Sequence, residues 1–486
     1  MAAVRISHLR KRYRMRAEAV DERWRLDRVL QTTIDDELFD AALERAGIPT
    51  GEEVCIRRVD SVVRLDPAQH DARLAAKWSV ALADAIAQYL SEGGPDVVRY
   101  RTRQAALVDM ACAATRGDLA RAWAWRSLGI WRGADVLEIN EARREAVAAL
   151  GREPRVAPRA LGVLARRGLL PLLVSSVRVE GWIALARASL VAWGVDESLV
   201  KRLLVADADV AGEAGEGTAA ERVVLLAWSM LAHTTTPGPS ALLVDHREVA
   251  RALAVLTLLE VEPALIASER GVAVVHQIAQ RMAVKAAPKT ARPSNETSIR
   301  VSSGTRVDGL PDELPEDGRA RATTSWGGLL FLLHVIRALD LPATLLADPA
   351  LSARSLRWTL HQLAMLLIAL AEDDPAALAF AGLAPGSRPP SSDEPPLNGT
   401  ESAVLHSAHA AIIATLREIM RATDEESDAA LVQRVASRSA EIVAELAWFE
   451  IRLSAAEVST SVRRAGLDLD PDWIPWLGVV VRFVYV

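Results

Sequence analysis

The sequence predicts a mainly helical protein, built of multi-helical globular domains with a small β element. Half of the 486 residues are apolar and a quarter are charged, which allows a large core under an ordinary surface. Apolar residues recur at helical spacing over most of the chain, as in the series Leu74, Trp78, Leu82, Ile86 and Leu90. Runs rich in β-branched residues are short and predict strands near 54–65, 447–453 and 478–486.

Composition also limits the classes of function. The formal net charge is -6. This argues against a nucleic-acid-binding protein, which needs a basic face to bind phosphates. Two cysteines, Cys55 and Cys112, are too few for a disulfide framework and fit the reducing cytoplasm. The basic N-terminus lacks the apolar stretch of a secretory signal, and the uncharged stretch 223–244 is broken by prolines. We therefore expect a cytoplasmic protein without a membrane span.

The N-terminal region, residues 1–285, reads as a succession of helices. Two helices are expected within residues 14–46, followed by the strand segment 54–65 and a helical region from 68 to about 150. Further helices are expected at 218–233, 245–261 and 263–285, with no fixed-period repeat. Residues 286–322 are rich in Pro, Ser, Thr, Asp and Gly and predict a disordered linker.

The C-terminal domain, residues 323–486, opens with three apolar helical segments. Thr323, Thr324 or Ser325 is expected to cap the first helix, in which Leu329 to Leu333 are apolar on every face and should be buried. Asp373 or Asp374 is expected to cap the third, with Pro375 in its first turn and Gly382 after its end.

Beyond these segments, the Pro-rich insert 385–400 predicts disorder. Long amphipathic helices are expected at 401–422 and 426–449. The strands near 447–453 and 478–486 are expected to form a small sheet, which the segment 54–65 could join.

The usual signatures of chemistry are missing or incomplete. The loop from Gly212 to Thr218 has the outer glycines of a phosphate loop but no lysine, no preceding strand, and acidic neighbours, so we read it as a solvated loop. His406 and His409 share a helical face without a third metal ligand. His334 and His361 lie in apolar segments, where they could face each other as a buried pair. We therefore expect no catalytic residue, cofactor or metal.

Tryptophan is the one residue type used unusually often, with 13 Trp against 4 Tyr and 5 Phe. Trp123, Trp125 and Trp131 alternate with Arg121, Arg126 and Arg132, which could form an aromatic and basic surface. The interpretation we favour is that these tryptophans belong to a core. Anchoring of a protein interface is the main alternative, since Trp and Arg are frequent where proteins meet.

Three apolar runs carry a resemblance to a known family. They read Gly-Gly-Leu-Leu-Phe-Leu-Leu-His at 327–334, Leu-Arg-Trp-Thr-Leu-His-Gln-Leu at 356–363 and Leu-Ala-Phe-Ala-Gly-Leu at 378–383. Their order and spacing resemble the tape-measure-type proteins encoded with bacterial contractile injection systems, phage-tail-like machines with a sheath, tube and baseplate. The resemblance covers roughly residues 20–70 and 323–383, and more loosely the last sixteen residues. This chain departs from the family pattern at Val335, where a proline is frequent, and at Ala381, where a cysteine is frequent.

The resemblance implies a non-enzymatic structural or assembly component of such a machine, with tube, sheath or baseplate proteins as partners and no nucleic acid. A literal ruler should be one long helix, and prolines interrupt this chain repeatedly. A cap or assembly chaperone therefore fits better than a ruler. The alternative is a helical adaptor or regulatory scaffold unrelated to injection systems.

Overall fold

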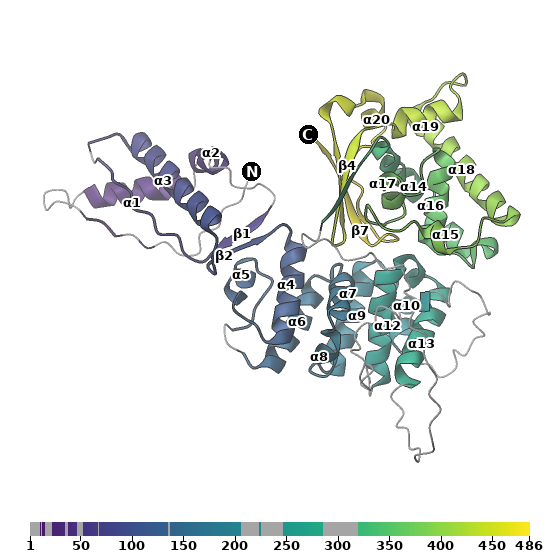
Figure 1. Cartoon of the computed structure of the whole chain (residues 1–486), viewed down its shortest axis with the longest axis horizontal. Coiled ribbons are helices and arrows are strands. Elements are labelled where there is room, and N and C mark those ends of the chain that lie inside the picture. Colours follow the sequence, from purple (N-terminus) through teal and green to yellow (C-terminus); the bar gives the residue numbers. More distant parts are fainter. Residues whose placement is uncertain are drawn as a thin grey trace, which may run out of the picture. The chain divides into compact units, whose positions relative to one another are not determined.

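The computed structural model describes residues 10, 12–14, 22–34, 37–45, 52–66, 68–134, 137–205, 223–224, 246–284 and 319–486. The chain divides into two compact units, residues 1–149 and 150–486 (Figure 1). Both are mainly helical with a small sheet, as the sequence predicts. That residues 1–285 and 323–486 form separate domains remains a prediction. Of the predicted linker, residues 286–318 lie outside the described part of the chain.

The first unit begins with three packed helices. Helices α1 (Glu22–Ile34) and α2 (Glu37–Arg45) both pack on the longer α3 (Asp71–Glu92). Leu26 and Leu30 of α1 meet Leu74 and Trp78 of α3 in one apolar cluster. The helical spacing that predicts α3 therefore marks a buried face, because residues four apart lie on one side of a helix.

A two-stranded sheet follows in the same unit. Strand β1 (Glu53–Ile56) pairs antiparallel with β2 (Val97–Tyr100), so the prediction that the 54–65 segment joins the C-terminal sheet is wrong. Only the start of that segment is a strand. The rest has no regular secondary structure, and its residues Val63 and Leu65 pack against the cluster between α1 and α3. The helices α4 (Arg103–Arg116), α5 (Ala122–Ser127) and α6 (Ile139–Arg152) complete the described part of this region.

The second unit starts with a bundle around one central helix. Its members are α7 (Ala157–Arg166), α8 (Leu170–Val174), α9 (Val179–Ala192), α10 (Glu197–Leu204), α12 (Arg247–Val261), the 3₁₀ helix η2 (Pro263–Ala267) and α13 (Glu269–Val284). Helix α12 contacts α7, α9, α10 and α13 and is buried from Val249 to Val261. A helix that is covered on every side is the core of its bundle.

The rest of the second unit is built on a five-stranded sheet in the order β3-β4-β5-β7-β6. The strands are β3 (Ala320–Thr324), β4 (Ala440–Glu445), β5 (Trp448–Leu453), β6 (Asp472–Ile474) and β7 (Val479–Tyr485). The pair β5 and β7 is parallel and the other neighbouring pairs are antiparallel. The strands predicted near 447–453 and 478–486 are confirmed.

Two predictions fail in this sheet. The expected helix 426–449 ends early: α19 covers Asp428–Ala436, and β4 then inserts between β3 and β5. Thr323 and Thr324, expected to cap a helix, instead belong to β3. The two errors share one cause, because β3 and β4 are short strands stabilised by pairing between segments about 120 residues apart.

Helices cover one side of this sheet (Figure 1). They are η3 (Gly327–Leu332), α14 (Leu333–Ala338), α15 (Leu341–Ala347), η4 (Pro349–Leu351), α16 (Leu356–Leu367), α17 (Pro375–Phe380), η5 (Pro390–Asp393), α18 (Gly399–Met420) and α19, with η6 (Ala455–Glu457) and α20 (Thr460–Arg464) nearer the C-terminus. Leu329 to Leu333 are fully buried, as predicted. Asp374 caps α17 by accepting a hydrogen bond from the Ala376 N–H, also as predicted.

Candidate functional site

The three segments that carry the resemblance form one folded core. Helix α17 packs against both η3 and α16. Phe331, Leu360 and Phe380, one from each segment, are completely buried in the same apolar cluster. The inward residues Ile442, Ile451 and Val481 of the sheet complete that cluster. The order and spacing of the three runs thus correspond to one packing unit of the fold.

Gly327 and Gly328 allow the first segment to approach this core closely. The Gly327 N–H donates to the carbonyl of Arg438 at 2.8 Å. A Cβ atom on Gly327 would lie 2.3 Å from the Cβ of Ala440, and one on Gly328 would lie 2.3 Å from the carbonyl oxygen of Val435. Such distances are far below van der Waals contact, so a side chain fits at neither position without a shift of the backbone.

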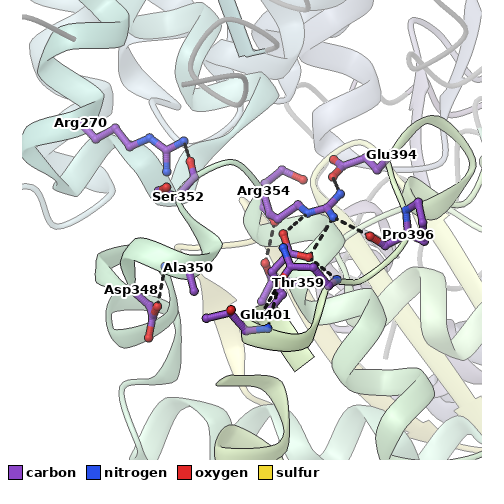
Figure 2. Close-up of polar contacts among 12 residues, drawn as sticks. Arg270, Asp348, Ala350, Ser352, Arg354, Thr359, Glu394, Pro396 and Glu401 are labelled. Carbon is purple, nitrogen blue, oxygen red and sulfur yellow. Dashed lines mark hydrogen bonds and ion pairs between the residues drawn. The ribbon is translucent and has the colours of Figure 1, made fainter. Parts of the chain in front are cut away.

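A buried arginine joins the start of α16 to the start of α18 (Figure 2). Arg354 Nε and Nη2 donate to the two carboxylate oxygens of Glu401 at 2.8 and 3.0 Å. Its Nη1 donates to Glu394 at 2.8 Å, and its guanidinium lies 4.1 Å from the ring centre of Trp358. These hydrogen bonds lower the pKa of Glu401 and raise that of Arg354.

Glu401 also completes the N-terminus of α18. Asn398 and Glu401 form a capping box, in which the Asn398 side chain accepts from the Glu401 N–H and the Glu401 side chain accepts from the Asn398 N–H. Arg354 additionally donates to the carbonyl of Pro396. The Pro-rich insert 385–400 is therefore held in place by these contacts, and the prediction that it is disordered is wrong. Two of the side chains that hold it, those of Arg354 and Glu401, lie outside the insert in the sequence.

A second buried charged group lies where the helical bundle meets α16. Glu262 is 2 % exposed, and its carboxylate accepts a hydrogen bond from the Leu356 N–H, the first residue of α16. Its Oε1 atom has no hydrogen-bond partner among the described residues. Burial raises the pKa of Glu262 to about 7, although Arg357 and Arg270 oppose that effect. Burial likewise lowers the pKa of Arg357.

The histidines do not form the arrangements considered from the sequence. His334 bonds to the carbonyl of Leu469, and His361 bonds to the carbonyl of Glu372, each at 2.8 Å. The two rings therefore have separate partners and do not pair. His361 is fully buried, and this burial lowers its pKa. His406 bonds to the carbonyl of Ser402 one turn earlier in α18.

Trp125 and Trp131 belong to the core, as favoured above, whereas Trp123 is half-buried. Trp125 and Trp131 are 0 % and 1 % exposed and meet edge to face, with ring centroids 5.9 Å apart. Trp125 Nε1 donates to the hydroxyl of Tyr100 at 2.7 Å, and Tyr100 donates to Asp109. Trp125, Trp131 and Leu329 to Leu333 are therefore closed to a partner in the folded protein. The sequence gives no signal for Trp24, a tryptophan that the fold leaves 86 % exposed.

Sites for ligands are few in the described residues. In that part of the chain, no group of three or more His, Cys, Asp or Glu side chains could hold a metal ion. An open polar depression of about 540 Å³ lies at the end of the sheet, between Thr324, Asp374, Glu441 and Arg452. The glycine-containing loop 212–218 lies outside the described residues.

Within the ranges described, no single helix has the length and apolar character of a membrane span. Two consecutive helical segments reach that length and apolar character only when taken together, and they are bent by 70° where they meet: Gly327–Ala338 and Leu341–Ala347. Both contribute to the core around the sheet. No protein-family model matches this chain, and no curated protein or solved structure is significantly similar to it.

Proposed function

We propose that this chain is a non-enzymatic structural or assembly component of a bacterial contractile injection system, acting through contacts with its tube, sheath or baseplate proteins. The observation that carries the proposal is the common core of the three segments that resemble the tape-measure-type proteins. Runs of similar apolar residues are frequent in helical proteins. Three runs whose order and spacing are linked to packing in one core are more specific evidence for a shared fold than isolated apolar runs.

The glycine pair adds weight to this resemblance. Gly327 and Gly328 lie within the first run, and each fills a position where a Cβ atom would clash with the chain. The matching run is therefore more than a hydrophobic pattern, because its two smallest residues are required by the packing of η3 against β4 and α19.

Helix length favours a cap or chaperone over a ruler. The longest helices among the described residues, α3 and α18, have 22 residues each. At about 1.5 Å per residue each spans roughly 33 Å. Each of the two units is compact by itself, which suits a protein that binds the ends or the subunits of a tube.

The direct test is isolation of the tagged full chain from its native host, followed by mass spectrometry. Enrichment of tube, sheath or baseplate proteins over a tag-only control supports the proposal. Their absence, with the chain eluting as a monomer, contradicts it and favours the adaptor alternative. The presence or absence of sheath, tube and baseplate genes beside its own gene separates the two hypotheses independently.

A further inference from the structure

The helical bundle and the sheet of the second unit meet at a joint around Glu262, the residue between α12 and η2. The Glu262 carbonyl accepts a hydrogen bond from the Leu265 N–H of η2 at 3.1 Å. Its carboxylate accepts one from the N–H of Leu356, the first residue of α16. One residue thus connects the end of the central helix of the bundle to the start of a helix that packs on the sheet.

Two arginines make further contacts across this joint. Arg270 of α13 donates a hydrogen bond to the carbonyl of Ser352, shortly before α16 (Figure 2). Arg357 of α16 donates in the opposite direction, to the carbonyl of Glu260 at 3.4 Å. Glu262 is 2 % exposed among these contacts, so water can surround its carboxylate only when the joint opens.

The buried carboxylate of Glu262 is poorly placed to carry a negative charge. Its Oε1 atom has no hydrogen-bond partner among the described residues, and a charged oxygen without a donor is costly in a protein interior. Burial raises the pKa of Glu262 to about 7, against the opposing effect of Arg357 and Arg270, and Glu394 adds to the rise. Loss of the proton therefore favours any state in which water reaches the side chain.

We propose that Glu262 is a pH-sensitive latch of this joint: ionisation of its carboxylate favours local opening between α12 and α16, in which the side chain becomes hydrated. The neutral side chain instead stays in the closed joint and keeps its hydrogen bond to the Leu356 N–H. The inference depends only on contacts within the second unit and does not rest on the proposed function.

The pH range of the latch follows from the two states of Glu262. In the open joint the carboxylate is hydrated and titrates near its ordinary pKa of 4.5, against about 7 in the closed joint. The equilibrium constant for opening should therefore rise about ten-fold with each pH unit between these two values. Above 7 it should level off, because the side chain is then ionised in both states.

Hydrogen exchange of the full chain, followed by mass spectrometry, measures this opening. The reporter is the Leu356 N–H, and labelling times are scaled to the intrinsic exchange rate at each pH. Between about pH 5.5 and 7.5 its scaled exchange rate should rise about ten-fold or more. It should also stay faster than exchange of the buried amides of α18, because local opening of the joint leaves α18 folded.

Three variants test the role of the carboxylate. Glu262→Gln keeps an acceptor for the Leu356 N–H but cannot titrate, so its exchange should show no such rise. Arg357→Met removes an arginine that lowers the pKa of Glu262, so the rise should continue to a higher pH before it levels off. The matched control is Glu197→Gln, which changes an exposed glutamate and should behave like the unmodified chain.

The proposal is overturned if the scaled exchange rate of Leu356 in the unmodified chain does not change with pH, or if Glu262→Gln retains the change. It is also overturned if Leu356 exchanges only as slowly as the α18 amides, because the event is then unfolding of the whole unit. A levelling-off pH that stays the same in Arg357→Met would contradict it independently, whether or not Glu262→Gln folds.

Discussion

Gly327 and Gly328 show how single residues determine the packing of the C-terminal core. At both positions the absence of a Cβ atom lets η3 lie directly on the backbone of neighbouring elements. The sequence reveals two adjacent glycines but gives no indication of what they approach, because Val435 and Ala440 are more than a hundred positions away. Local rules do succeed at Asp374 and Pro375, whose roles at the start of α17 depend only on adjacent residues.

We predict that Gly328→Ala lowers the free energy of unfolding by about 1–3 kcal/mol, because the new methyl group overpacks against the Val435 carbonyl. Urea denaturation followed by circular dichroism measures this change. The matched control is Gly399→Ala at the start of α18, where no atom lies within 4 Å of the added Cβ. Its effect should stay within about 0.5 kcal/mol. Equal effects of the two substitutions would show that close packing at Gly328 is not responsible.

At the scale of elements, the helices were more predictable than the strands. The spacing that predicts α3 and α16 is present within each segment. Strands β3 and β4 are rich in Ala, Arg and Glu, which favour helix, and they form because they pair with each other across about 120 residues. The same reason applies to the insert 385–400, whose order depends on Arg354 and Glu401 outside it.

We predict that Arg354→Met lowers the free energy of unfolding by about 3–5 kcal/mol, because it removes the arginine that pairs with the buried Glu401 carboxylate. The insert should also become mobile, and thermolysin should then cleave near Leu397, which is 39 % exposed. Unfolding curves and mass spectrometry of the fragments measure the two effects.

Two controls define this prediction about Arg354. Arg187→Met removes an exposed ion pair with Glu197 and should cost no more than about 1 kcal/mol. The double variant Arg354→Met/Glu401→Leu should recover part of the loss, since it removes the main uncompensated charge as well. A stable Arg354→Met variant with a protected insert would refute the assigned role.

At the scale of the whole molecule, Glu262 connects parts of the second unit. It follows the central helix α12, and its side chain accepts a hydrogen bond from the first N–H of α16. Arg270 of α13 makes a second connection by donating to the carbonyl of Ser352 (Figure 2). The groups that act on the Glu262 charge are Arg357, Arg270 and Glu394. Beside these polar contacts, Trp193 of the bundle meets Trp473 of β6 edge to face, with ring centroids 4.9 Å apart.

We predict that Glu262 makes stability fall as pH rises. Its pKa is about 7 in the folded chain, against 4.5 for an ordinary glutamate, so the folded state retains a proton that the unfolded state loses. The stabilising contribution is present below 4.5 and disappears as pH rises through 7. Urea unfolding from about pH 5 to 8 should show this decline relative to Glu262→Gln, which cannot titrate. An identical pH profile for Glu262→Gln would contradict the prediction. The control is Glu197→Gln, which changes an exposed glutamate and should leave the pH profile of the unmodified chain in place.

We propose that this chain assists assembly of a contractile injection machine. Deletion of its gene in the native host, followed by electron microscopy of the purified particles, tests that claim most directly. We expect assembled particles to be lost, or to have shortened or irregular tubes, and complementation with the unmodified gene should restore them. Normal particles in normal number after deletion would contradict the account.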